Sequence, residues 1–259
     1  MKFMKLTSKL SLQAIAALAL LLAAFPALAQ NTVDRVALVN ALAGDVRYSS
    51  KDGAWVSASI GTKLYAGDKV KTGPGSHADI DLGGGVGIVQ VAPQSVFVIE
   101  KITSTDAGPD RVTETQIGVN DGAVYAKINK LAKGSRYEIA TPKGIAGIRG
   151  TAVYVTADGQ VTVLDGEAVV AYPNGNGGVD LYTVKSGQTV GPTDRPPHAA
   201  PPDLLRSIVE ALRDASTHGV GRETPPFVQG LTPFISPVLP RGSVASGGSV
   251  IIDPPPPTN

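Results

Sequence analysis

Apolar and polar residues alternate in short runs through most of this chain, which is the pattern of half-buried β-strands. Residues 160–164 show the alternation clearly, because Val161 and Val163 are separated by a threonine and a glycine-containing turn lies on either side. The same pattern predicts thirteen strands, over residues 35–42, 45–48, 69–71, 77–82, 87–91, 95–101, 112–119, 122–127, 137–140, 152–156, 160–164, 167–171 and 180–184.

Short strands at this spacing indicate an antiparallel sandwich, a barrel or a short β-solenoid. The chain has no exact internal repeat, which disfavours a long regular solenoid. We therefore predict an all-β domain over residues 30–190, built as an antiparallel β-sandwich or a short β-solenoid-like fold.

The composition changes after this domain. Residues 191–202 are rich in proline and predict a linker, and residues 203–217 predict one amphipathic helix. Because a free apolar stripe is an aggregation liability, we expect the helix to fold back on the sheet; docking on another protein is the alternative. Residues 218–259 alternate Pro, Gly and Ser with isolated apolar residues and predict a disordered Pro/Gly-rich tail.

The first residues have the pattern of a secretory signal peptide. Lys2, Lys5 and Lys9 precede an apolar stretch over residues 15–25, and an Ala-Leu-Ala sequence ends at Ala29. An uncleaved membrane anchor is the alternative, but a bilayer span needs about 20 apolar residues. We predict residues 1–29 to be a signal peptide cleaved after Ala29, export to the periplasm or the extracellular space, and no membrane span thereafter.

Composition excludes several kinds of chemistry. The 259 residues contain no cysteine, so disulfides, thiolate metal sites and a cysteine nucleophile are absent. The formal net charge of +1 gives no global attraction to nucleic acid. The chain has 30 glycines and 20 prolines, an excess that favours turns and irregular segments over a helical bundle.

Two pairs of carboxylates are the first candidates for acid–base chemistry. Asp79 and Asp81 would project from one face of a strand, and we expect that face to be the solvent face. Asp165 and Glu167 flank Gly166 and predict a solvated turn. Neither pair has a nearby basic residue with an activating role, and no G-x-S-x-G motif occurs.

The three histidines do not form a predicted metal site. His77 has small polar neighbours and is expected on a surface strand, whereas His198 and His218 fall in the linker and the tail. We predict no catalytic, cofactor-binding or metal-binding residue, and no enzyme.

Two glycine-rich segments remain. Residues 83–87 lack the lysine of a phosphate-binding loop and predict a hairpin turn. Residues 141–151 contain G-x-x-G-x-x-G, which is not the dinucleotide-binding spacing. We expect a tight passage of closely approaching backbones there, with Arg149 held by carbonyls or a carboxylate; a small anion site at Lys143 and Arg149 is the alternative.

Several blocks of the chain together resemble the FecR domain family of the bacterial envelope, over about residues 36–190. The resemblance begins at Gly44-Asp45-Val46 and Trp55, and it continues through residues 61–73 and the Pro93-Gln94-Ser95 element. Its most specific part runs from Gly122-Ala123-Val124-Tyr125 through residues 137–142 to Ile148-Arg149-Gly150-Thr151, followed by residues 158–166 and Ser186-Gly187-Gln188.

The resemblance implies a domain that makes protein–protein contacts and has no catalytic activity. Well-known members of the family carry an anti-sigma segment and a membrane helix before this domain, and this sequence has the predicted signal peptide there instead. We therefore expect a non-enzymatic FecR-type domain that acts in the cell envelope as a protein-binding, signalling or scaffold module, with an envelope protein as its partner and no cofactor. The alternative is a carbohydrate or cell-wall binding module, for which Trp55, the only tryptophan, would stack against a sugar.

Overall fold

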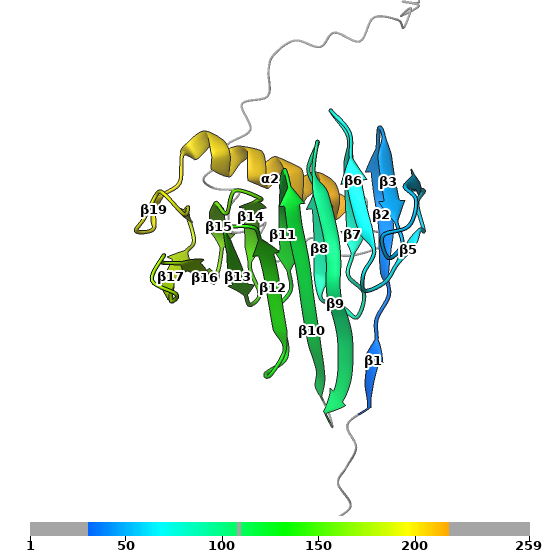
Figure 1. Ribbon diagram of the computed structural model, residues 1–259, viewed down its shortest axis with the longest axis horizontal. Coiled ribbons are helices and arrows are strands. Elements are labelled where there is room, and N and C mark those ends of the chain that lie inside the picture. The colour runs from blue at the N-terminus through cyan, green and yellow to red at the C-terminus, as the bar shows by residue number, and fades with distance from the viewer. Residues whose placement is uncertain (1–30, 108–109, 218–259) are drawn as a thin grey trace, which may run out of the picture. The chain divides into compact units, whose positions relative to one another are not determined.

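The computed structural model describes residues 31–107 and 110–217, and these residues form two facing β-sheets and one helix (Figure 1). Sheet A has the order β17 (Val179–Lys185), β16 (Glu167–Pro173), β13 (Gly144–Ile148), β12 (Arg136–Thr141), β10 (Asp110–Asp121), β9 (Val96–Ala107), β6 (Lys69–Thr72), β3 (Val46–Ser49), β4 (Val56–Ser57), with β1 (Thr32–Asp34) paired to β9. Sheet B has the order β19 (His198–Ala199), β18 (Gln188–Val190), β15 (Val161–Asp165), β14 (Ala152–Thr156), β11 (Ala123–Ile128), β8 (Gly87–Val91), β7 (His77–Asp81), β2 (Ala37–Ala43), β5 (Lys63–Leu64). The helix is α2 (Pro202–Thr217).

The chain crosses repeatedly from one sheet to the other. Strand β10 lies in sheet A, β11 in sheet B, and β12 returns to sheet A beside β10. Because β11 carries the chain back along the other layer, β12 runs parallel to β10, whereas every other strand pair described is antiparallel. The sheets do not close into a barrel, so the two-sheet sandwich among the predicted architectures is confirmed.

Alternation of side chains fills the space between the sheets with one apolar core. Phe97 and Ile99 from β9 face Ile80 and Val89 from β7 and β8, and all four side chains are fully buried. Each of the thirteen predicted strands is present, most within two residues of its predicted ends. Strands β9 and β10 are longer than predicted. Residues 102–107 at the end of β9 pair with residues 110–115 at the start of β10, and β9 also pairs with β1 there.

The prediction for residues 141–151 missed a strand. Gly144–Ile148 forms β13, which lies between β12 and β16 and buries Ala146 and Ile148. The expected close approach is present at Gly144, where a Cβ atom would lie 2.6 Å from the carbonyl oxygen of Ala171. The glycines weaken the apolar alternation, which is why the pattern did not reveal the strand.

Residues 83–87 form the predicted hairpin turn between β7 and β8. The turn depends on glycine, because Gly83, Gly84 and Gly85 all have positive φ angles, between 60° and 72°.

The predicted helix is α2, and it folds back on sheet B, where it packs against β8, β11 and β15 (Figure 1). Its apolar stripe is buried there, at Ile208, Val209, Leu212 and Ala215. Part of the predicted linker is also tied to the sandwich, since β19 pairs with β18 and Arg195 forms an ion pair with Asp180 at 3.0 Å. The predicted signal peptide and tail lie outside the described residues.

One buried arginine joins the two sheets. Arg35 lies between β1 and β2 and is only 7% exposed. Its Nη1 donates to the carbonyl oxygens of Leu82 (2.7 Å) and Gly83 (3.1 Å) beside β7. Towards sheet A, its Nε donates to the carbonyl oxygen of Thr103 (3.1 Å), and its Nη2 donates to the Thr115 hydroxyl and the Glu114 carbonyl oxygen (3.4 Å). The planar guanidinium thus binds acceptors in both layers at once.

Substitution of Arg35 tests this bridge. We expect Arg35→Leu to lower the free energy of unfolding by about 3 kcal/mol or more, because several buried acceptors lose their donor. Arg111→Leu is the control, since the Arg111 side chain is 61% exposed, and it should change stability by less than about 0.5 kcal/mol. Urea unfolding followed by circular dichroism measures both, and equal stabilities of the two variants would contradict the bridge.

Two buried tyrosines differ in the hydrogen bonding of their hydroxyl groups. Tyr137 and Tyr172 are each 1% exposed. The Tyr172 hydroxyl donates to the carbonyl oxygen of Gly159 at 2.7 Å and lies 3.2 Å from that of Val190. The Tyr137 hydroxyl has no hydrogen-bond partner among the described residues. Burial raises the pKa of both tyrosines, so both hydroxyls stay neutral over the ordinary pH range.

Removal of each hydroxyl should therefore have opposite consequences. We expect Tyr172→Phe to lose about 1 kcal/mol of stability, and Tyr137→Phe to be neutral or to gain up to about 1 kcal/mol, because it removes a buried group without a partner. Chemical denaturation compares the pair directly. A loss in Tyr137→Phe as large as that in Tyr172→Phe would show that the Tyr137 hydroxyl is bonded.

Candidate interaction surface

The predicted acid–base residues have structural roles. Asp79 is fully buried, so the expectation that it lies on a solvent face is wrong. Its neighbours Ala78 and Ile80 point into the core, and Asp79 therefore lies on the face of sheet B on which α2 packs. There its carboxylate accepts a hydrogen bond from Gln90 Nε2 at 2.9 Å. Asp81 caps the hairpin turn by accepting the Gly83 N–H at 2.8 Å.

The other sequence candidates are dispersed. Asp165 and Glu167 flank Gly166 at the turn between β15 and β16, as predicted. His77 is half-buried on β7, His198 lies 3.1 Å from Asp194, and His218 is outside the described residues. Over residues 31–107 and 110–217, no three His, Asp or Glu side chains gather as metal ligands.

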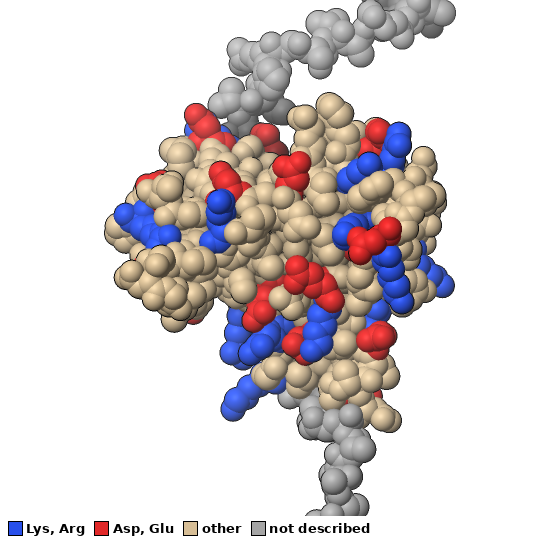
Figure 2. Space-filling model, in the orientation of Figure 1, with Lys and Arg blue, Asp and Glu red and all other residues tan. Residues whose placement is uncertain are grey.

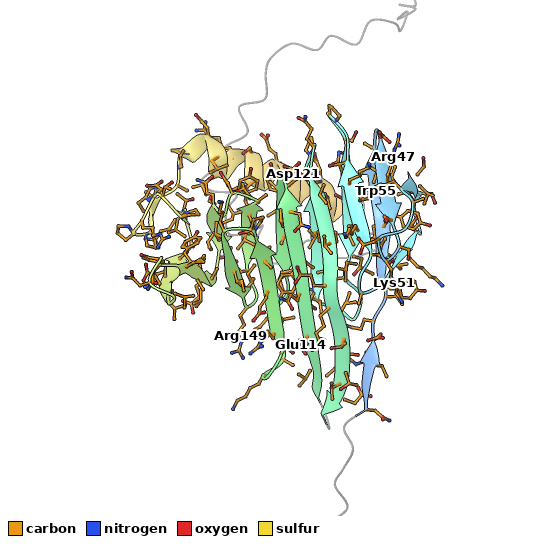
Figure 3. The ribbon with its side chains drawn as sticks, in the orientation of Figure 1. Arg47, Lys51, Trp55, Glu114, Asp121 and Arg149 are labelled. Carbon is orange, nitrogen blue, oxygen red and sulfur yellow. The ribbon has the colours of Figure 1, made fainter. Side chains whose placement is uncertain are left out.

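The anion-site alternative at Lys143 and Arg149 does not fit the structure. The two residues flank the five-residue strand β13, and an extended segment of that length holds them roughly 20 Å apart. Arg149 is exposed and has no hydrogen bond within the described part of the chain, so the expectation that carbonyls or a carboxylate hold it is also wrong. Figure 3 places Arg149 at the lower end of the sheet, far from Trp55.

A different group of side chains lies together at the β4 end of sheet A. We name it the Trp55 surface and define it by Arg47, Trp55, Ser57 and Lys71. Trp55 is 36% exposed, although it is a large apolar residue, and Val56, on the opposite face of β4, is 47% exposed. Arg47 on β3 lies opposite Lys71 on β6, and Lys71 Nζ is 4.4 Å from the centre of the Trp55 ring. Arg47 and Trp55 appear together at this end in Figure 3.

The turn that precedes Trp55 is held in one conformation by local bonds. Lys51 and Asp52 have positive φ angles of 45° and 63°, which is unusual for residues other than glycine. Asp52 forms an ion pair with Lys69, and the Ser49 hydroxyl donates to the carbonyl oxygen of Gly53 at 2.8 Å. The turn therefore presents Trp55 and the short edge strand β4 as a fixed platform.

The two sheets differ in how their outer faces are covered. On sheet B, α2 covers a partly polar face that includes the Tyr125 and Tyr154 rings, 4.9 Å apart, and Lys127, which is 5% exposed. Sheet A has no helix on it within residues 31–217. Figure 2 shows charged groups of both signs on the molecule and an uncharged region at the lower left, over β16 and β17.

Comparison with known proteins identifies the central part of this fold. The family model described as FecR protein matches residues 68–169, from the residue before β6 to the third residue of β16. The chain thus contains a FecR domain, as the sequence motifs indicated. A comparison with curated proteins gives no match. No helix in the described part of the chain has the length and apolar character needed to cross a bilayer.

Two crystal structures of a protein assigned as an anti-sigma factor, from Parabacteroides distasonis ATCC 8503, are similar to this chain. The first has 14% identity and a TM-score of 0.38 and covers 51% of this chain and 58% of its own. The second has 13% identity and a TM-score of 0.40 and covers 55% of this chain and 63% of its own. The chain thus spans about three fifths of the length of those proteins.

The matched residues supply the centre of the sandwich, whereas most of the Trp55 surface precedes them. Arg47, Trp55 and Ser57 lie before residue 68, and only Lys71 lies within the match. The sequence indicates Trp55 as a platform for a sugar but does not indicate Arg47 and Lys71. Cross-strand pairing brings these two cations together, and local sequence does not show it.

Lys127 gives the covered face a measurable pH dependence. Burial lowers the pKa of Lys127 from its ordinary value of 10.5 to about 8. Between these two pH values the unfolded chain binds the proton that the folded chain has released, so stability should rise with pH in this window. We expect the stability difference between the wild-type protein and Lys127→Met to change between pH 8 and 10.5 and to be flat from pH 6 to 7. Parallel stability profiles across the whole range would contradict the lowered pKa.

Proposed function

We propose that this protein is a non-enzymatic FecR-type module of the bacterial cell envelope that binds another protein and serves signalling or a scaffold. The observation that carries the proposal is the Trp55 surface, an exposed tryptophan beside Arg47 and Lys71 on a fixed platform. Tryptophan, tyrosine and arginine are the residue types that contribute most often to binding energy at protein interfaces.

Other features support parts of this proposal. The FecR match over residues 68–169 supports a regulatory role. The pattern of residues 1–29 supports export, with cleavage after Ala29. The absence of catalysis is supported by the structural roles of Asp79 and Asp81, whose carboxylates bind Gln90 and the hairpin turn.

The sugar-binding alternative fits Trp55 less well than a protein partner does. A sugar stacks on the flat face of an exposed aromatic ring, and Lys71 Nζ lies 4.4 Å over the Trp55 ring. A protein partner with an acidic or apolar side chain can use the ring edge and the neighbouring cations together.

A photo-crosslinking amino acid at Ser57, which lies opposite Arg47 on the same face of sheet A as Trp55, tests the proposal in producing cells. We expect an adduct with one defined envelope protein, and no such adduct from the same probe at Thr183, at the other end of sheet A. With that partner purified, Trp55→Ala should weaken binding at least about tenfold, the loss typical of an interface hot spot. Because Trp55 is the only tryptophan, its fluorescence reports binding of the wild-type protein directly.

The Arg111→Ala variant serves as the control for binding, since Arg111 is exposed and distant in sequence from the surface. Unchanged thermal unfolding of Trp55→Ala must accompany the loss of binding. Equal affinity of Trp55→Ala and wild type would refute the role of this surface. Binding to cell-wall polymers that is lost in Trp55→Ala, without any protein adduct, would support the carbohydrate alternative instead.

A further inference from the structure

The opposite end of sheet A is formed by β17, a seven-residue edge strand. Val179 and Leu181 on this strand are 60% and 67% exposed. The other strands at sheet edges are shorter: β4, β5 and β19 have two residues each, and β1, which pairs only with β9, has three. Strand β17 is therefore the longest free edge in the described part of the chain, and long exposed apolar edges favour pairing with another strand.

The backbone hydrogen bonds show which residues of β17 are available. The Asn174 N–H donates to the carbonyl oxygen of Gly178 at one end of the β16–β17 hairpin, and the Ser186 N–H donates to the carbonyl oxygen of Gly166 at the other. Hydrogen-bonded pairs alternate with non-hydrogen-bonded pairs along an antiparallel ladder. The N–H and C=O groups of residues 180, 182 and 184 therefore point to β16, and those of residues 179, 181 and 183 point outward. Within residues 31–107 and 110–217, no hydrogen bond involves the outward groups of Val179, Leu181 or Thr183.

The side chains on this edge continue an uncharged row across the open face of sheet A. Leu181 is the last member of this row, which crosses six neighbouring strands. Its members, paired in register, are Val98, Gly118, Ala140, Ile145, Ala171 and Leu181. The row ends at the uncharged lower left of Figure 2.

The edge lacks the usual protection against pairing. Its one central charge, Asp180, is bound by Arg195 at 3.0 Å and by Asn174 Nδ2 at 3.3 Å. Lys185 lies at the end of the strand, and its backbone N–H already donates to the side-chain Oε1 of Gln188 at 3.0 Å. The β16–β17 pairing is regular, without a bulge, and β17 contains no proline.

We propose that β17 pairs antiparallel with β17 of a second copy of this chain, with Leu181 on the twofold axis. This register places Leu181 against Leu181 and Val179 against Thr183, and it pairs all the outward backbone groups of these residues. It also joins the uncharged rows of the two copies into one. A register with the axis at Asp180 would set two carboxylates against each other, and one at Tyr182 would set Val179 against Lys185, so the chain's own sequence selects Leu181.

Cysteine substitution tests the register, because the natural chain has no cysteine. Paired residues on a twofold axis have Cα atoms about 5.5 Å apart, within the range of a disulfide. We expect Leu181→Cys, purified from the envelope of producing cells, to form a disulfide-linked dimer on mild oxidation. Val179→Cys and Thr183→Cys should not crosslink alone, since four residues separate each from its counterpart, but a mixture of these two variants should crosslink.

Sedimentation of the unsubstituted protein provides the second measurement. We expect a concentration-dependent dimer that Leu181→Lys abolishes, with unchanged circular dichroism, because Leu181 is exposed. A monomer at every concentration, or equal crosslinking by all three cysteine variants alone, would overturn the proposal. Crosslinking of Leu181→Cys only to a different envelope protein would also overturn it, in favour of a foreign strand.

This inference is independent of the Trp55 surface, which lies at the other end of sheet A. Trp55→Ala should leave the dimer intact, and Leu181→Lys should leave partner binding at Trp55 intact. The failure of either proposal can therefore be recognised without the other.

Discussion

The guanidinium of Arg35 holds the two layers of this fold together at one place. It donates to carbonyl oxygens beside β7 in sheet B and to acceptors on β9 and β10 in sheet A, while the side chain itself is almost fully buried. A sandwich without cysteine has no disulfide between its sheets, so the apolar core and such polar bridges help to fix their alignment. The long β9–β10 ribbon and the β7–β8 hairpin are positioned by the same residue.

This alignment leaves the two outer faces unequal. The amphipathic helix α2 packs on the outer face of sheet B, and Asp79, Gln90 and Lys127 are buried on that face. Sheet A carries no helix among the described residues, and large apolar side chains are exposed at its two ends, Trp55 and Val56 at one end and Val179 and Leu181 at the other. All four residues flank the segment matched by the FecR family, so the shared segment supplies the framework and its flanks supply the surfaces.

Local pattern was sufficient to predict thirteen strands and the helix, because alternation and helical spacing depend on neighbours in sequence. It missed the strands of only two or three residues, β1, β4, β5, β18 and β19, and it missed β13, where glycines replaced the expected alternation. It also failed at Asp79, which is buried on the face of sheet B that α2 packs against, and that helix begins more than 120 residues later. The same limit hid the Trp55 surface, since Arg47 and Lys71 meet only through strand pairing. Arg35 was predicted only as part of a strand, because its acceptors come from three distant segments.

We propose that a protein covers the Trp55 end of sheet A in the cell. Oxidative footprinting of Trp55 in intact cells, compared with the purified protein, measures this directly. We expect Trp55 to react much more slowly in cells, whereas Ile145, exposed on the same sheet but far from β4, should change little. Equal reactivity of Trp55 in the two samples, relative to Ile145, would show that no protein covers this end of the sheet.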